Sequence, residues 1–212
     1  MSKPVLYGFD ASTYVRTVRM QFAEKNVDYD QVPVNVLEGE PHSPEHLFRH
    51  PFGKVPVLEH DGLRIIETSA IVRYIEDVFS GPPLIPDTPR DRARMDMAMA
   101  ITDSYGYPSL IGGVAAYHLF PQLVGGQNDD ARREGLKRST VVLKELMRIR
   151  GDSPFIAGER QTLADCYLAP ICFYVSLTED AGEVFDVEGF APWWDRVQAL
   201  PSFRSTEPDL GE

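Results

Sequence analysis

The chain has 212 residues, which is long enough for one large domain or two small domains with hydrophobic cores of their own. Its net charge of −11 argues against nucleic acid or an anionic membrane surface as a partner, because their phosphates would be repelled. No apolar run approaches the length of a membrane-spanning helix and no apolar leader follows Met1, so we expect a cytoplasmic protein.

The chain begins with a pattern of strand, helix and strand. Val5-Leu6-Tyr7 is a short apolar run that predicts a strand. Within 13–25, apolar residues recur at a four-residue spacing, which is typical of an amphipathic helix. A second strand is expected at 32–36, and Pro33 marks it as an edge strand because proline cannot donate to a neighbouring strand.

A short helix and a hairpin follow. Ser43 before Pro44 favours a helix start, since serine caps free amides and proline suits the first helical position. Strands are expected at 55–59 and 63–66, joined by the turn His60-Asp61-Gly62, and a helix is expected at 69–79. The first eighty residues therefore predict an α/β domain with the order βαβ, a short helix, and ββα.

The second half of the chain predicts helices alone. Residues 81–89 are rich in proline and form a stiff linker, so the expected domains are 1–80 and 90–212. No convincing strand pattern and no internal repeat follow the linker. The helices of this all-α bundle are expected at 90–101, 107–120, 129–150, 163–177 and 192–200.

The loop from His50 to Val57 is the least ordinary segment. Val55-Pro56-Val57 places a proline at the start of a strand, which predicts a bend and a cis peptide that exposes backbone hydrogen-bonding groups. The segment is followed by a helix start at Glu67-Thr68-Ser69. Exposed backbone beside free helix amides predicts a binding site for a small peptide-like anion.

Ser12 lies directly before the first helix. Its ordinary role at this position is that of an N-cap, and its hydroxyl can also donate a hydrogen bond to an anion at the positive end of the helix. Thr13 is an alternative hydroxyl donor. Arg16, one turn further along, either adds positive charge or belongs to a solvated face.

Thr68 or Ser69 can likewise cap its own helix or help to hold a ligand carboxylate, while Glu67 can face a ligand ammonium group. His42 and Lys54 are expected in loops, where such side chains are ordinarily exposed to solvent and have no specific function.

Several kinds of site are not indicated. Cys166 and Cys172, the only cysteines, are six positions apart on one expected helix, too far for a disulfide, and no cysteine lies near the first helix start. The histidines lack the spacing of metal ligands, and no hydrolase, P-loop or dinucleotide-binding motif is present. We therefore expect no metal and no permanently bound cofactor.

Taken in order, these motifs resemble those of the cytosolic glutathione transferases, most of all the serine-type plant phi and related bacterial groups. The resemblance covers nearly the whole chain. In the second half it rests on Thr162-Leu163-Ala164-Asp165, which is similar to a buried capping box. The other matching segments are Leu6-Tyr7-Gly8, Ala11-Ser12, Ser43-Pro44-Glu45-His46-Leu47, His50 to Pro56, Glu67-Thr68, Trp194-Asp195-Arg196 and Pro201-Ser202-Phe203.

The resemblance implies a thioredoxin-like domain that binds glutathione and an all-α domain that supplies the pocket for a hydrophobic electrophile. Ser12 would donate to the glutathione sulfur, and Val55 would pair its backbone with the cysteinyl unit. The glutamyl end would be held by Glu67 and Thr68, and the glycine end by His42 and Lys54. Tyr7 would be structural.

The resemblance also implies a homodimer contact at Phe52 and a role in detoxification, with glutathione as co-substrate. Candidates for the electrophile pocket are Phe9, Tyr105, Tyr107, Tyr117, His118 and Phe120, some of which can equally serve as core residues. His42 stands where the family usually has lysine, Lys54 where it has glutamine, and Thr68 where it has serine. The alternatives are a non-enzymatic glutathione-binding protein and a glutathione-dependent isomerase or peroxidase.

Overall fold

The computed structural model, which describes residues 2–210, contains a four-stranded sheet in the order β2-β1-β3-β4. Strand β1 (Val5–Tyr7) pairs parallel with β2 (Asp30–Val32) and antiparallel with β3 (Val57–His60). Strand β3 pairs antiparallel with β4 (Leu63–Ile65). A parallel βαβ unit followed by an antiparallel hairpin is the expected thioredoxin-like arrangement, and that prediction is confirmed.

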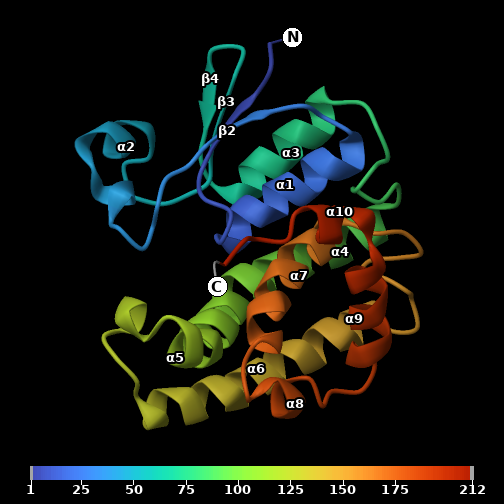
Figure 1. Ribbon diagram of the computed structural model, residues 1–212. Helices are drawn as coiled ribbons and strands as arrows, with labels where there is room; N and C mark the ends of the chain where they lie inside the picture. The colour runs from blue at the N-terminus through green and yellow to red at the C-terminus, as the bar shows by residue number, and fades with distance from the viewer. Residues whose placement is uncertain (1, 211–212) are drawn as a thin grey trace. The chain divides into compact units, whose positions relative to one another are not determined.

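The sheet has a helix-covered face and an opposite face that α2 approaches. Leu6 and Leu58 lie directly opposite each other in the β1–β3 pair and are fully buried. Helices α1 (Thr13–Lys25) and α3 (Thr68–Val78) pack against each other on one side of the sheet, and α2 (Pro44–Arg49) lies on the other side (Figure 1). Because successive side chains alternate, Tyr7 and Glu59 belong to the face opposite Leu6 and Leu58.

Two strand predictions were wrong by a few residues. Strand β2 lies at Asp30–Val32 rather than 32–36, and β3 begins at Val57 rather than Val55. In both cases a proline marks the limit, because Pro33 and Pro56 have no N–H to contribute to the ladder. The Val55-Pro56 peptide bond is cis, as expected.

The remaining helices include a longer continuous run than predicted. Helix α4 (Pro89–Ile101) passes directly into the π-helix η2 (Thr102–Ala115) and then α5 (Ala116–Leu119), where two separate helices were expected at 90–101 and 107–120. Pro108 lies inside the wide turns of η2, where its missing N–H is accommodated without breaking the helix. The other helical elements are η1 (Glu40–His42), η3 (Pro121–Val124), α6 (Asp129–Arg150), α7 (Leu163–Ser176), α8 (Ala181–Val184), α9 (Phe190–Ala199) and α10 (Pro201–Ser205).

Two glycines allow η2 and α6 to pack closely. A Cβ atom added to Gly113 would lie 2.7 Å from the Cα atom of Gly135, and the reverse substitution would clash with the Gly113 backbone in the same way. Small residues at both positions therefore set the separation of these two helices. Neither glycine was singled out by its sequence pattern.

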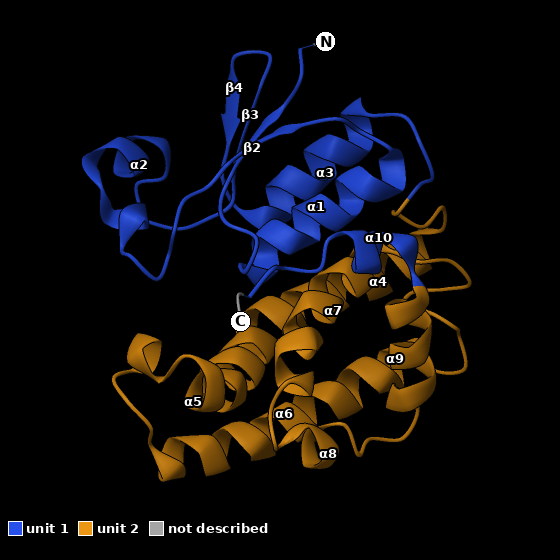
Figure 2. Ribbon diagram, in the orientation of Figure 1, with its two compact units in different colours: residues 1–83, 200–212 blue, residues 84–199 orange. Residues whose placement is uncertain are grey.

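The chain forms two compact units, one from Met1–Pro83 with Leu200–Glu212 and one from Leu84–Ala199 (Figure 2). The expected boundaries of 1–80 and 90–212 differ from these at the carboxyl end, since α10 belongs to the first unit. Arg16 on α1 holds α10 there. Its guanidinium donates a hydrogen bond of 2.8 Å to the Phe203 carbonyl and lies 4.2 Å from the centre of the Phe203 ring.

Asp165 is the buried polar centre of the helical unit. Its carboxylate accepts hydrogen bonds from the amide and hydroxyl of Thr162, at 2.8 and 2.9 Å, which completes the predicted capping box at the start of α7. It also accepts from the Ile156 amide at 3.0 Å and the Trp193 indole at 2.8 Å. Burial raises the pKa of the Asp165 carboxyl, and these four donors oppose that shift.

We expect Asp165→Ala to lower the free energy of unfolding by about 3–5 kcal/mol, because it leaves four buried donors without an acceptor. Urea denaturation followed by circular dichroism measures the effect. Asp165→Asn is the matched control, since its amide oxygen retains part of the acceptor capacity and should lose less. A loss below about 1 kcal/mol in the alanine variant would contradict the proposed importance of this centre.

Candidate functional site

One end of the sheet gathers the predicted binding residues. Tyr7, the last residue of β1, lies opposite Val57, the first residue of β3. A Cβ atom added to Gly8 would lie 3.4 Å from the Val55 Cβ atom, so the loop after β1 and the loop before β3 are in contact. Because β4 runs antiparallel to β3, its carboxyl end and the following Glu67-Thr68 lie at the same end of the sheet.

Ser12 is the N-cap of α1. Its Oγ accepts a hydrogen bond of 3.4 Å from the Val15 amide, and its side chain is half-buried. Thr13 is only 6% exposed, so Ser12 is the more accessible of the two candidate hydroxyls. The structural role and the proposed anion-binding role of Ser12 are compatible, since the hydroxyl accepts through oxygen lone pairs and keeps its proton for another partner.

The start of α3 differs from a normally capped helix. Its N-cap is Glu67, which makes no capping hydrogen bond through its side chain, and the helix begins at Thr68. The expectation that Thr68 or Ser69 caps this helix in the ordinary way is therefore wrong. Glu67 also has a φ angle of +68°, a conformation that is uncommon outside glycine and is concentrated at functional sites. The free amides of α3 suit an anion.

The loop that follows α2 is held by two buried histidines. The His46 ring donates a hydrogen bond of 2.7 Å from Nε2 to the Lys54 carbonyl. The His50 Nδ1 accepts a bond of 3.3 Å from the Phe52 amide, and the His50 carbonyl accepts one of 2.9 Å from the Gly53 amide. These contacts fix the path of the chain just before Val55.

His42, the last residue of η1, and Lys54, in the loop after α2, lie next to the same glycine and have exposed side chains. Gly53 has a φ angle of +59°, and a Cβ atom there would lie 2.7 Å from the His42 Nδ1 atom, so the imidazole packs directly over this glycine. Lys54 is the next residue and makes no ion pair with the described residues. Two potentially cationic side chains thus flank one turn.

Sequence reasoning missed the role of His46 and His50. The three histidines His42, His46 and His50 recur at a spacing of four, and this pattern could have indicated that they belong to one local structure. Among residues 2–210, no group of three or more histidine, cysteine, aspartate or glutamate side chains is arranged to hold a metal ion. His46 and His50 instead shape the loop 51–56 that leads to the cis proline.

The aromatic candidates for an electrophile pocket are divided between the two compact units. Phe9 belongs to the first unit, whereas Tyr107, Tyr117 and Phe120 belong to the second. Phe120 packs edge-on to Tyr174 with ring centres 5.5 Å apart. A cavity of about 850 Å³ between η2 and α6 is lined by Tyr105, whereas Tyr107, Tyr117 and Phe120 are not part of its lining.

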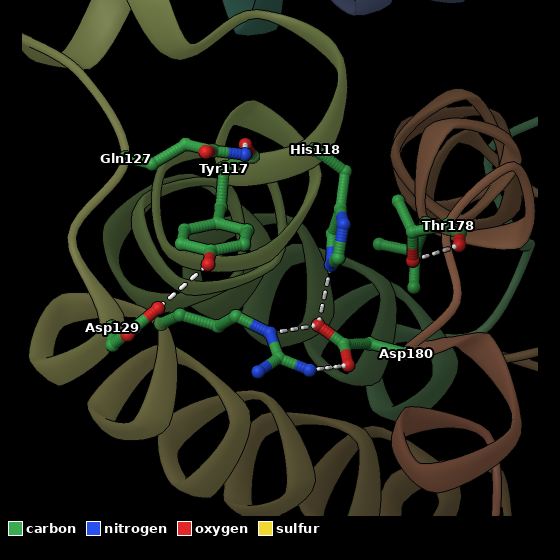
Figure 3. Close-up of polar contacts among 8 residues, drawn as sticks. Tyr117, His118, Gln127, Asp129, Thr178 and Asp180 are labelled. Atoms are coloured by element: carbon green, nitrogen blue, oxygen red, sulfur yellow. Dashed lines mark hydrogen bonds and ion pairs between the residues drawn. The ribbon is translucent and has the colours of Figure 1, made fainter.

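Tyr117 and His118 belong to a polar network in the helical unit (Figure 3). The Tyr117 hydroxyl donates a hydrogen bond of 2.6 Å to Asp129, and the His118 Nε2 lies 2.8 Å from Asp180. Arg132 pairs with Asp180, and with the smaller effect of His118 this holds the pKa of the Asp180 carboxyl below its usual range. The network connects α5, α6 and the start of α8.

None of the described helices is both long enough and apolar enough to cross a membrane. The two cysteines are free and buried, and burial raises the pKa of the Cys172 thiol far above its usual range, so this thiol stays protonated.

We expect the protein to lose stability as the pH falls from about 6.5, because burial lowers the pKa of His50 below its ordinary value of 6.5. In that range the unfolded chain binds a proton at His50 that the folded chain does not bind, so acid favours unfolding. Protonation would also remove the acceptor used by the Phe52 amide. Thermal unfolding from pH 8 to pH 5 measures the effect, and His50→Asn should show a shallower decline. An identical decline in both proteins would contradict this assignment.

Comparisons with known proteins identify the family of this chain. Models of the glutathione S-transferase N-terminal and C-terminal domains match residues 6–83 and 109–201. Glutathione S-transferase F14 of Arabidopsis thaliana is 31% identical over 189 residues, which cover 86% of this chain and 74% of the relative. The crystal structure of glutathione transferase F7 from Populus trichocarpa superimposes with a TM-score of 0.86 at 26% identity, covering 96% of this chain and 97% of that chain.

A third comparison comes from maize. Glutathione S-transferase I, solved in complex with an atrazine glutathione conjugate, superimposes with a TM-score of 0.83 at 25% identity over 97% of each chain. The relatives that carry these matches are plant phi-class enzymes, as the sequence motifs indicated. The chain belongs to the glutathione S-transferase family.

Proposed function

We propose that this protein is a glutathione transferase that attacks hydrophobic electrophiles with the thiolate of glutathione, and that Ser12 stabilises this thiolate. The observation that carries the proposal is the half-buried Ser12 at the amino end of α1, in a chain of this family. Glutathione is a co-substrate in this reaction, and Ser12 supplies polarity rather than a covalent bond.

A hydroxyl hydrogen bond and a helix amino end can supply the free energy that is needed to stabilise the thiolate. A free thiol is only a few per cent thiolate at neutral pH. Lowering its pKa by about two units requires about 2.7 kcal/mol of preferential stabilisation of the anion. A hydrogen bond to a charged acceptor supplies about 1.5–3 kcal/mol, and a helix amino end adds about 0.3–1 kcal/mol. The hydrogen bond and the helix amino end together are sufficient for this shift in the thiol pKa.

The reaction then follows from the thiolate. The thiol proton passes to solvent, and a sulfur lone pair forms the new carbon–sulfur bond. The displaced electron pair leaves with a departing group or moves onto the electron-poor part of the acceptor. Phe9, Tyr107, Tyr117 and Phe120 remain predictions for the electrophile side; the complex of the maize relative with an atrazine glutathione conjugate supports a planar, apolar class of acceptor.

The remaining parts of the tripeptide have matching groups at the same end of the sheet. The Val55 backbone would pair with the cysteinyl unit. Glu67 would face the ammonium of the glutamyl end while Thr68 and the uncapped amides of α3 hold its carboxylate. His42 and Lys54, both exposed beside Gly53, would hold the glycine carboxylate.

We also propose a homodimer that uses Phe52, and a cytoplasmic role in detoxification. Phe52 is 68% exposed, and an apolar side chain this exposed gains free energy when a second copy covers it. The two free thiols fit a reducing compartment.

We expect Ser12→Ala to lower kcat for conjugation of a chloronitroarene about 10- to 100-fold, since one hydrogen bond to the thiolate is lost. The pKa of bound glutathione, followed by thiolate absorbance, should rise in the same variant. Thr13→Val is the matched control and should retain activity. Full retention in Ser12→Ala with loss in Thr13→Val would assign the sulfur contact to Thr13.

For the dimer, Phe52→Ser should shift the protein from dimer to monomer in sedimentation experiments, because the buried apolar contact is removed. Leu177→Ser is the matched control, since Leu177 is also an exposed apolar residue, at 46%, and lies outside α2 and the loop that contains Phe52. A wild-type protein that sediments as a monomer, or a Phe52→Ser variant that remains a dimer, would refute this contact.

A further inference from the structure

The sheet face that α2 approaches carries a set of interlocked polar side chains. Glu59 lies directly opposite Arg64 in the β3–β4 pair, and Tyr7 and Glu59 are diagonal neighbours in the β1–β3 pair. The Tyr7 hydroxyl donates a hydrogen bond of 2.9 Å to one Glu59 carboxylate oxygen. The Arg64 Nε donates one of 2.7 Å to the other oxygen. The Glu59 carboxylate on β3 is thereby hydrogen-bonded to side chains of both β1 and β4.

Two arginines connect this set to α2. The Arg49 guanidinium, from the last turn of α2, lies 4.4 Å from the centre of the Tyr7 ring and also pairs with Glu45 at 2.8 Å. Arg64 reaches α2 from the sheet: it donates a hydrogen bond of 2.9 Å to the Phe48 carbonyl and lies 4.9 Å from the centre of the Phe48 ring. A short helix of six residues has little stability of its own, so these contacts matter for its position.

The position of α2 affects the loop that follows it, residues 51–56. His46, on α2, holds the Lys54 carbonyl, and the His50 amide, at the end of α2, donates to the His46 carbonyl at 2.7 Å. Lys54 directly precedes Val55. Any displacement of α2 from the sheet would therefore move the backbone that precedes the cis proline.

We propose that Tyr7, Glu59, Arg64 and Arg49, here called the α2 clamp, are positioning residues that hold α2 on the sheet. They thereby preform the arrangement of His42, at the end of η1, and Lys54, in the loop after α2. The α2 clamp acts on affinity for the glycine end of glutathione and not on the thiolate. This inference rests on the proposed function for its kinetic consequence, while its structural consequence is independent of any ligand.

The state of Tyr7 agrees with this role. Burial, together with the hydrogen bond to Glu59, raises the pKa of the Tyr7 phenol above its ordinary value, so the hydroxyl remains a protonated donor. Its proton is already directed at Glu59. Tyr7 therefore has a different role from Ser12, which caps α1.

The test uses Arg49→Met and Tyr7→Phe in the full-length protein. We expect the KM for glutathione to rise about threefold to tenfold in Arg49→Met, with kcat at saturating glutathione changed less than twofold. Arg148→Met is the matched control, because Arg148 pairs with Glu145 on α6 at 2.7 Å but is not part of the α2 clamp, and its KM should not change. Tyr7→Phe should raise KM in the same direction. A fall in kcat in Tyr7→Phe without a change in KM would overturn the proposal and point to a role at the sulfur.

Hydrogen exchange without glutathione provides the second measurement. Amides of residues 45–50 should exchange about threefold to tenfold faster in both α2 clamp variants, while α1 and α3 keep their protection. Unchanged exchange in α2, or faster exchange throughout the unit, would overturn the proposal. If the parent protein shows no glutathione turnover, the proposed function fails by itself, and this measurement still decides whether the α2 clamp holds α2.

Discussion

The antiparallel pairing of β1 with β3 is the constraint on which the candidate binding region depends. It places Leu6 against Leu58 in the core and directs Tyr7 and Glu59 to the opposite face. The same register brings the loop after β1, with Ser12, beside the loop before β3, with Val55. A shift of one residue would exchange the two faces, expose the core leucines and bury Glu59, so packing leaves little freedom in this register.

The two faces of the sheet carry different structural features of the candidate site. Helices α1 and α3 lie on one side and offer their amino ends, where free amides favour an anion. On the other side, α2 is too short to be stable alone and is attached through aromatic rings, arginines and one shared carboxylate. The first arrangement suits stabilisation of charge, and the second suits positioning of a loop.

The helical unit is organised around a buried carboxylate and a close helix contact. Asp165 satisfies donors from three separate segments, which ties the start of α7 to the preceding loop and to α9. Gly113 and Gly135 let η2 and α6 approach to a distance that no side chain would permit. The capping box at Thr162 was visible in the sequence because its two members are local, whereas the donors from Ile156 and Trp193 were not.

The sequence by itself determined the elements whose causes are local: the helix at Thr13–Lys25, the start of α2 at Pro44 with its serine cap, the helix at Asp129–Arg150, and an α/β first part followed by helices. It also carried the family motifs and the cis bond before Pro56. Only the tertiary structure decided that β2 and β3 stop at prolines, that Pro108 lies within a continuous helix, that α10 returns to the first unit, and that α3 lacks a side-chain cap. Those features depend on hydrogen-bond partners and packing contacts between residues distant in the chain, which no local pattern encodes.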